Sequence, residues 1–165
     1  MPPNAGRRAR AVASGQPCGK ICCVWRELIE SSRSDVVFQT AAPDDALQLA
    51  ERDLGLVLPA ELRSFLSETD GLTDAAGWTV LAWPLDRIVI ENLRHRDPTW
   101  PFAQEGPWQD RLCFADNGAG DDFFIDMTGS QPGVLVWSYI DGLAHVMAQS
   151  LEAFWAGWLS GTLTT

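Results

Sequence analysis

The sequence predicts an α+β fold in which a mainly antiparallel central sheet is flanked by helices. Helical patterns precede and follow a group of strand patterns rather than alternating with them, which disfavours a parallel sheet. A tight-turn signal also joins two strand patterns that are adjacent in the chain, as an antiparallel pair requires. With 165 residues, of which 46% are apolar, the chain can bury one hydrophobic core. We therefore expect a single domain.

Three helices are predicted in the first half, over residues 25–32, 43–54 and 59–69. The second is the clearest, because Pro43 suits the first helical position and Gly55 supplies a C-terminal stop. Apolar residues also share one face of this segment, as an amphipathic helix requires. The third helix repeats the pattern of an initial proline and a following glycine, so the two are expected to pack as a pair.

The other elements follow from changes in the spacing of apolar residues. Residues 134–139 are apolar on both faces, which is typical of a central strand covered on both sides. Ser150 can cap the last helix. Besides the central strand, we predict a buried strand over 78–83, a helix from Pro84 through Arg94, a surface loop over 98–110, a short strand over 144–147 and a final helix from Ser150 to about Gly161.

Residues 112–127 form the most informative segment, a predicted β-hairpin. Asn117-Gly118 between two apolar runs favours a two-residue primed turn, and Gly120 leaves a longer loop or a bulge as the alternative. Side chains alternate along a strand, so one face of the second strand is apolar and the other carries carboxylates. We expect the hairpin to bury the first face and to expose the second. The apolar face carries Phe123, Ile125 and Met127. The face with the carboxylates carries Asp122, Phe124 and Asp126.

The net charge of −10 is unevenly distributed along the chain. Residues 1–34 carry six Lys or Arg and two Glu, whereas residues 35–165 carry six Arg and twenty Asp or Glu, a net charge of −14. Such an acidic domain argues against binding to nucleic acid, which requires clustered basic residues. No apolar run approaches the roughly 20 residues that cross a bilayer. We therefore predict neither a nucleic-acid nor a membrane partner, although an acidic surface can attract a basic protein.

We interpret residues 1–23 as a disordered basic tail and residues 24–165 as the domain. Val24 is a candidate for the natural start, because valine is encoded by the alternative start codon GTG, and an organelle address is the alternative interpretation of the tail. Of the four cysteines, Cys113 falls on a predicted strand, and no spacing matches a common zinc motif. We expect Cys113 to be a small buried hydrophobic residue. We also expect the protein to lie in a reducing, cytoplasmic compartment.

A search for catalytic motifs finds none. The chain has two histidines, so a multi-histidine metal site is excluded, and counting from Asp116 the hairpin places Gly where a calcium loop needs oxygen ligands. We predict that His95 is solvated at a helix end and that His145 is partly buried among apolar neighbours. Paired carboxylates acting on a sugar remain a less favoured alternative. The sequence thus predicts a protein that is not an enzyme and has no catalytic residue, metal or cofactor.

Trp100 and Trp108 stand apart from the other six tryptophans because they lie in the proline-rich loop over 98–110. An exposed tryptophan beside acidic residues can anchor a protein interface. Folding of both side chains back onto the sheet is an equally good interpretation.

Four motifs in this order resemble the SUKH superfamily of SMI/KNR-type domains over about residues 25–159. They read LQLAERDLGLVLPAELRSFLSETDGL, WTVLAWPLDRIVIEN, FADNGAGDDFFID and VLVWSYIDG. The resemblance implies an α+β domain with an antiparallel sheet, as the residue patterns predict independently. The family motif corresponds here to Trp83, Pro84, Asp116, Asn117, Gly118, Gly120, Asp121 and Trp137.

The resemblance also implies a function by binding. Bacterial members of this superfamily are regarded as immunity proteins that neutralise polymorphic toxins, often nucleases, and an acidic surface could imitate phosphate charge toward such a toxin. An intracellular adaptor is the alternative, since eukaryotic relatives act as interaction modules. The candidate partner-binding residues are Asp116, Asn117, Asp121, Asp122, Asp126, Trp100 and Trp108.

Overall fold

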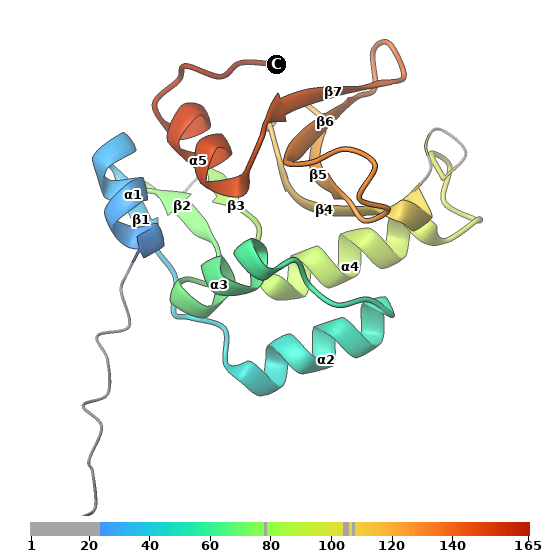
Figure 1. Cartoon of the computed structure of the whole chain (residues 1–165), viewed down its shortest axis with the longest axis horizontal. Helices are drawn as coiled ribbons and strands as arrows, with labels where there is room; N and C mark the ends of the chain where they lie inside the picture. The colour runs from blue at the N-terminus through green and yellow to red at the C-terminus, as the bar shows by residue number, and fades with distance from the viewer. Residues whose placement is uncertain (1–23, 78, 104–105, 107) are drawn as a thin grey trace, which may run out of the picture.

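A computed structural model describes residues 24–77, 79–103, 106 and 108–165. The predicted tail at 1–23 therefore lies wholly outside the described residues. The predicted strand at 78–83 lies outside them at residue 78 only. The elements, in chain order, are α1 (Val24–Ser32), β1 (Val36–Phe38), α2 (Asp44–Leu54), α3 (Ala60–Glu68), β2 (Leu72–Asp74), β3 (Val80–Ala82), α4 (Leu85–Arg96), the 3₁₀ turn η1 (Trp108–Asp110), β4 (Arg111–Asp116), β5 (Asp122–Asp126), β6 (Val134–Ser138), β7 (Leu143–Ala148) and α5 (Leu151–Leu159), as Figure 1 shows.

The strands form two antiparallel sheets, which confirms the predicted α+β class. One sheet has the order β1-β2-β3 and the other β4-β5-β6-β7. The backbone N–H of Trp83 donates to the carbonyl of Phe114 at 3.3 Å, so the two sheets meet where β3 approaches β4. Strands β1 and β2 were not predicted, because three residues are too short to show an alternating pattern.

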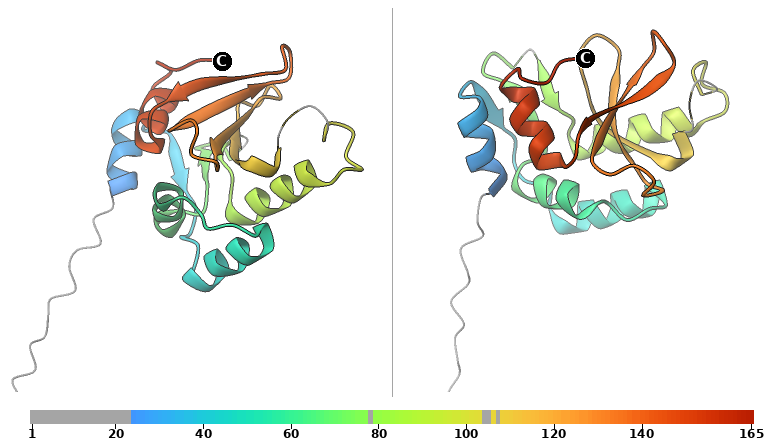
Figure 2. Two further views of the ribbon diagram at one scale, coloured as in Figure 1. Left: turned by 45° about the vertical axis from the view of Figure 1, so that its right-hand side comes forward. Right: turned by 45° about the horizontal axis from the view of Figure 1, so that its top comes forward.

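Helices α4 and α5 lie on different sides of the four-stranded sheet (Figure 2), whose last strand, β7, is mostly exposed. The ring of Phe123 on β5 packs against Phe154 of α5, with ring centroids 4.8 Å apart. Its neighbour Asp122 points instead toward His95 of α4. The prediction that the carboxylate face of the hairpin is exposed is therefore wrong, because α4 covers that face at Asp122, which is buried.

Several helix boundaries match the prediction closely. Helices α2 and α3 each begin one residue later than predicted, so Pro43 and Pro59 are the N-cap residues and not the first helical residues. Gly55 ends α2 in the left-handed conformation, with φ of 67°, as its position after the apolar stripe predicts. Among the described residues, no helix is both long enough and apolar enough to cross a membrane.

Asn92 attaches α4 to the edge strand β4. Its buried side chain donates from Nδ2 to the carbonyls of Ile88 and Cys113, both at 2.7 Å. Its Oδ1 accepts the backbone N–H of Cys113 at 2.9 Å. An edge strand leaves outward N–H and C=O groups without a neighbouring strand, and burying them unpaired would be unfavourable. One amide side chain thus satisfies both outward groups of Cys113 and fixes α4 against the sheet.

Replacing Asn92 with Ala is expected to lower the free energy of unfolding by about 2–4 kcal/mol, because it leaves the buried backbone groups of Cys113 unpaired. Chemical denaturation measures this value. Ile90→Ala is the matched control on the same helix, because Ile90 is 60% exposed and its truncation should change the free energy by less than about 1 kcal/mol. Equal effects of the two substitutions would show that Asn92 does not anchor α4.

Candidate functional site

A surface pocket of about 510 Å³ lies where α4, the segment after it and the hairpin loop between β4 and β5 come together. It combines two carboxylates, two guanidinium groups and a group of aromatic rings. The residues that line it are Arg87, Arg94, His95, Trp100, Phe102, Asp116, Gly118, Gly120, Asp122 and Tyr139. Three of the predicted partner-binding residues, Trp100, Asp116 and Asp122, therefore share one pocket.

The hairpin loop is the longer alternative and not the two-residue turn. No described residue other than glycine has a positive φ, so Asn117 does not take the conformation that a type I′ turn requires. Gly118 and Gly120 do, with φ of 73° and 115°. The Asn117 side-chain oxygen accepts the backbone N–H groups of Ala119 and Asp121, at 2.8 and 3.0 Å. These bonds give the rim of the pocket a defined shape.

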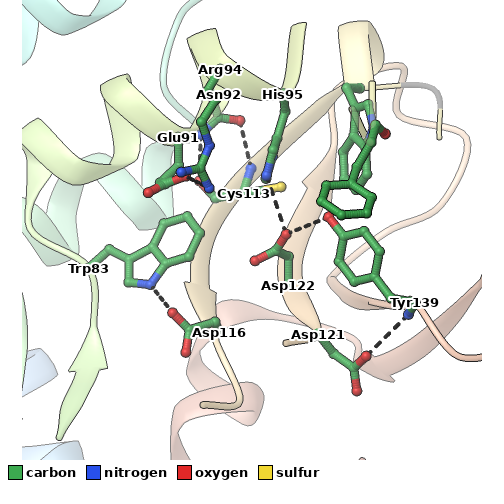
Figure 3. A network of polar contacts seen from close by, with 12 residues as sticks. Trp83, Glu91, Asn92, Arg94, His95, Cys113, Asp116, Asp121, Asp122 and Tyr139 are labelled. Carbon is green, nitrogen blue, oxygen red and sulfur yellow. Dashed lines mark hydrogen bonds and ion pairs between the residues drawn. The ribbon is translucent and has the colours of Figure 1, made fainter. Parts of the chain in front are cut away.

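Asp116 fixes the start of this loop and one wall of the pocket (Figure 3). Its Oδ2 accepts Trp83 Nε1 and Arg87, each at 2.7 Å, and its Oδ1 accepts the backbone N–H of Gly118 at 2.8 Å. The Arg87 guanidinium also lies 4.5 Å from the centroid of the Trp83 ring. The charge of Asp116 is therefore already paired, and its first role is to position the loop.

Asp121 joins the loop to the end of strand β6. It accepts the backbone N–H of Tyr139 at 3.2 Å and Nδ2 of Asn117 at 2.9 Å. Because Tyr139 also lines the pocket, these bonds hold opposite parts of the rim together.

Asp122 lies at the floor of the pocket in a very different environment. It is 8% exposed; Tyr139 donates its hydroxyl to Asp122 Oδ2 at 3.1 Å, and His95 Nε2 lies 3.5 Å from the same oxygen (Figure 3). Burial raises the pKa of Asp122 to about 7, against the opposing effect of the Tyr139 hydrogen bond, and the nearby Asp116 and Glu91 charges raise it further. This carboxyl group thus changes its charge near neutral pH.

The side chain of His95 is buried beside two tryptophans, so the prediction of a solvated helix end is wrong. Its ring centroid lies 4.5 Å from that of Trp100 and 4.6 Å from that of Trp108. Burial lowers the pKa of His95 to about 4, and the Arg94 and Arg96 charges lower it further, so the imidazole is neutral at pH 7. The prediction for His145 is also wrong: it is exposed on edge strand β7 and contacts Asp141.

Cys113 brings a thiol to the same floor from strand β4. One ligand atom each from His95, Cys113 and Asp122 lies within 4.8 Å of the others, and all three residues are buried. Complete burial raises the pKa of the Cys113 thiol well above its usual value, so the sulfur is protonated and is not an activated nucleophile. This group can hold a metal ion more readily than it can perform nucleophilic catalysis.

The other four predicted residues do not themselves line the pocket. Trp108 is buried and its ring stacks on Tyr139, so folding back onto the sheet is the correct interpretation for this residue. Asp126 lies at the opposite end of β5, where it accepts the backbone N–H groups of Thr128 and Gln131, both at 2.9 Å. Asn117 and Asp121 shape the loop that forms the rim.

Sequence reasoning missed Arg87, Arg94, Phe102 and Tyr139 as parts of the site. Phe102 alone carried a usable signal, since it lies two residues after Trp100 in the same proline-rich segment. The others occur within predicted elements, and only the tertiary arrangement directs them to one pocket.

The fold and the pocket define a small α+β domain that presents a preformed, aromatic-walled cavity on its surface. Residues 41–157 match the model of the SMI1/KNR4 family (SUKH-1), and the chain belongs to this family. This match confirms the resemblance found in the sequence motifs. A comparison with curated proteins gave no match.

Without bound metal, the free energy of unfolding should change with pH because the pKa of Asp122 is raised in the folded protein. Its folded pKa of about 7 lies above the ordinary aspartate value of 3.8, so its contribution to stability is present at low pH and is lost as the pH rises from about 4 through 7. Asp122→Asn cannot ionise and can still accept the Tyr139 hydrogen bond. We expect the free energy of unfolding of this variant, relative to that of the parent protein, to rise by about 2–4 kcal/mol between pH 4 and pH 8.

Denaturation in the presence of EDTA at both pH values measures this gain. The exposed Asp53 of α2 provides the matched control. The free energy of unfolding of Asp53→Asn, relative to the parent protein, should change by less than about 0.5 kcal/mol over the same pH range. A gain no larger than that of the control would contradict the raised pKa.

Proposed function

We propose that this protein is a non-catalytic binding protein of the immunity type, which neutralises a cognate protein toxin in the cytoplasm by direct association. Membership in the SUKH family, which is known for immunity-type proteins, supports this proposal. The observation that carries it is the preformed pocket, whose rim is held by hydrogen bonds of Asp116, Asn117 and Asp121. A partner can dock there without first ordering the loop.

The aromatic wall of the pocket supplies the anchor for such a partner. Phe102 is 47% exposed, Trp100 is half-buried, and their ring centroids lie 5.3 Å apart. Aromatic side chains on a rigid support bury much area at little entropic cost, and they dominate many protein interfaces. The two arginines of the wall are paired, Arg87 with Asp116 and Arg94 with Glu91. They contribute directional hydrogen-bond donors without making the pocket strongly basic.

The charge of the domain favours a basic partner. A net charge of −14 over residues 35–165 attracts a positively charged protein over long range and raises its association rate. A toxin that cleaves nucleic acid needs a basic face to bind its substrate. We therefore propose a nuclease domain as the toxin, with its basic face directed at the acidic domain.

Co-expression in a bacterial host tests the proposed function. The partner to test is the C-terminal domain of any large secreted protein encoded beside this gene, and growth is scored with and without this protein. We expect rescue from killing and a complex that co-purifies. Continued killing despite soluble expression would exclude that pair, and the absence of any such neighbouring gene would favour the adaptor function.

The pocket itself is tested by Phe102→Ala, which removes an exposed aromatic ring from the wall. We expect the affinity for the toxin domain to fall by about tenfold or more, as for other aromatic anchors. Val57→Ala is the matched control, because Val57 is 75% exposed in the connection between α2 and α3. Binding measured by surface plasmon resonance should be unchanged in the control. Equal affinities of the two variants would place the interface elsewhere.

A further inference from the structure

Three different metal-ligating groups converge beneath the pocket from three different elements. His95 comes from α4, Cys113 from β4 and Asp122 from β5, and Figure 3 shows their side chains directed toward one another. One donor atom from each lies within 4.8 Å of the others. Because helix and strands are rigid supports, this convergence is built into the fold and does not depend on a mobile loop.

We propose that His95, Cys113 and Asp122 form a binding site for a divalent transition-metal ion of the Zn²⁺ class. Metal binding releases the proton of the Cys113 thiol to solvent. The resulting combination of imidazole, thiolate and carboxylate donors suits Zn²⁺ and its spectroscopic substitute Co²⁺, and is unlike the all-oxygen sites of Mg²⁺ and Ca²⁺. Donors around a tetrahedral Zn²⁺ ion lie about 3.3–3.8 Å apart, given ligand distances of about 2.0–2.3 Å. His95 Nε2 and Asp122 Oδ2 already lie 3.5 Å apart, and the widest donor pair needs a contraction of at most about 1 Å.

The ligand groups are held from behind, as metal ligands commonly are. Asn92 binds both backbone groups of Cys113, and Tyr139 donates its hydroxyl to Asp122 at 3.1 Å. The imidazole of His95 lies against the rings of Trp100 and Trp108, which restrict its rotation. Supporting contacts of this kind fix the orientation of metal ligands and tune their affinity.

His95 carries a second sign of an unfilled role. Its Nδ1 atom is buried without a hydrogen-bond partner among the described residues, and only 4% of the side chain is exposed. Buried polar atoms are nearly always paired, and an unpaired one requires an explanation. The neutral imidazole is in the form that binds a metal.

The pocket provides both an entry path and an open coordination position. His95 and Asp122 line the cavity of about 510 Å³, whereas Cys113 lies behind them. Three protein ligands leave the fourth tetrahedral position of Zn²⁺ free. Because His95 and Asp122 line the pocket, water or a donor atom from a docked partner could reach that position from there.

Titration with Co²⁺ tests the site in the full-length protein, with Cys18, Cys22 and Cys23 of the tail replaced by Ser so that Cys113 is the remaining thiol. The protein is treated with EDTA, dialysed and titrated with CoCl₂. We expect a single equivalent to produce a thiolate-to-cobalt charge-transfer band together with the visible bands of four-coordinate Co²⁺. Excess Zn²⁺ should then remove both.

Variants assign the ligands. Cys113→Ser should abolish the charge-transfer band, and His95→Gln or Asp122→Asn should weaken Co²⁺ binding by at least about tenfold. The control is His145→Gln, because His145 and Asp141 form an exposed pair 3.0 Å apart that could bind metal adventitiously. This variant should bind Co²⁺ unchanged.

A second measurement covers the case in which a variant fails to fold. Zn²⁺ should raise the Tm of the parent protein but not that of Asp122→Asn, which retains an acceptor for the Tyr139 hydroxyl. Absence of the charge-transfer band in the parent protein would overturn the proposal. So would Co²⁺ affinities that the substitutions of His95 and Asp122 leave unchanged in folded protein.

Discussion

The attachment of α4 to the edge of strand β4 by Asn92 is the interaction on which the site depends. Because this amide binds both outward backbone groups of Cys113, it sets the position of α4 along the strand. Arg87, on the helix turn before Asn92, can then reach Asp116, and His95, one turn after it, lies over Asp122. One buried amide thus places both the wall and the floor of the pocket.

The same hairpin holds two aspartates in opposite electrostatic conditions. Asp116 accepts three hydrogen bonds, one of them from Arg87, so its negative charge is stabilised where it is needed to hold the loop. Asp122 is buried beside a hydroxyl and a neutral imidazole, and no compensating cation binds it among the described residues. Burying such a group is unfavourable for stability. This arrangement is typical of a residue that serves binding rather than folding.

Local signals in the sequence predicted much of the architecture but little of the pocket. Pro43 with Gly55 bounded a helix, and Asn117 with Gly120 indicated the hairpin, because these residues act on their own backbone. The burial of His95 depends on Trp108, which is thirteen positions away and beyond the end of its helix. The metal-ligating group has no recognisable spacing either, because its members reach one another only through strand pairing and helix packing. Such long-range contacts leave no periodic trace in a single sequence.

The proposed docking surface and the metal-ligating group share one pocket but occupy different depths of it. Phe102 lies at the exposed wall, whereas Asp122 is nearly inaccessible at the floor. A partner that contacts only the wall would bind independently of a metal ion beneath it. A partner that extends a donor atom to the floor would complete the coordination of the metal, and the two binding events would then stabilise each other. The dependence of the affinity for the proposed toxin on Asp122 therefore distinguishes a purely aromatic contact from recognition through a bound metal.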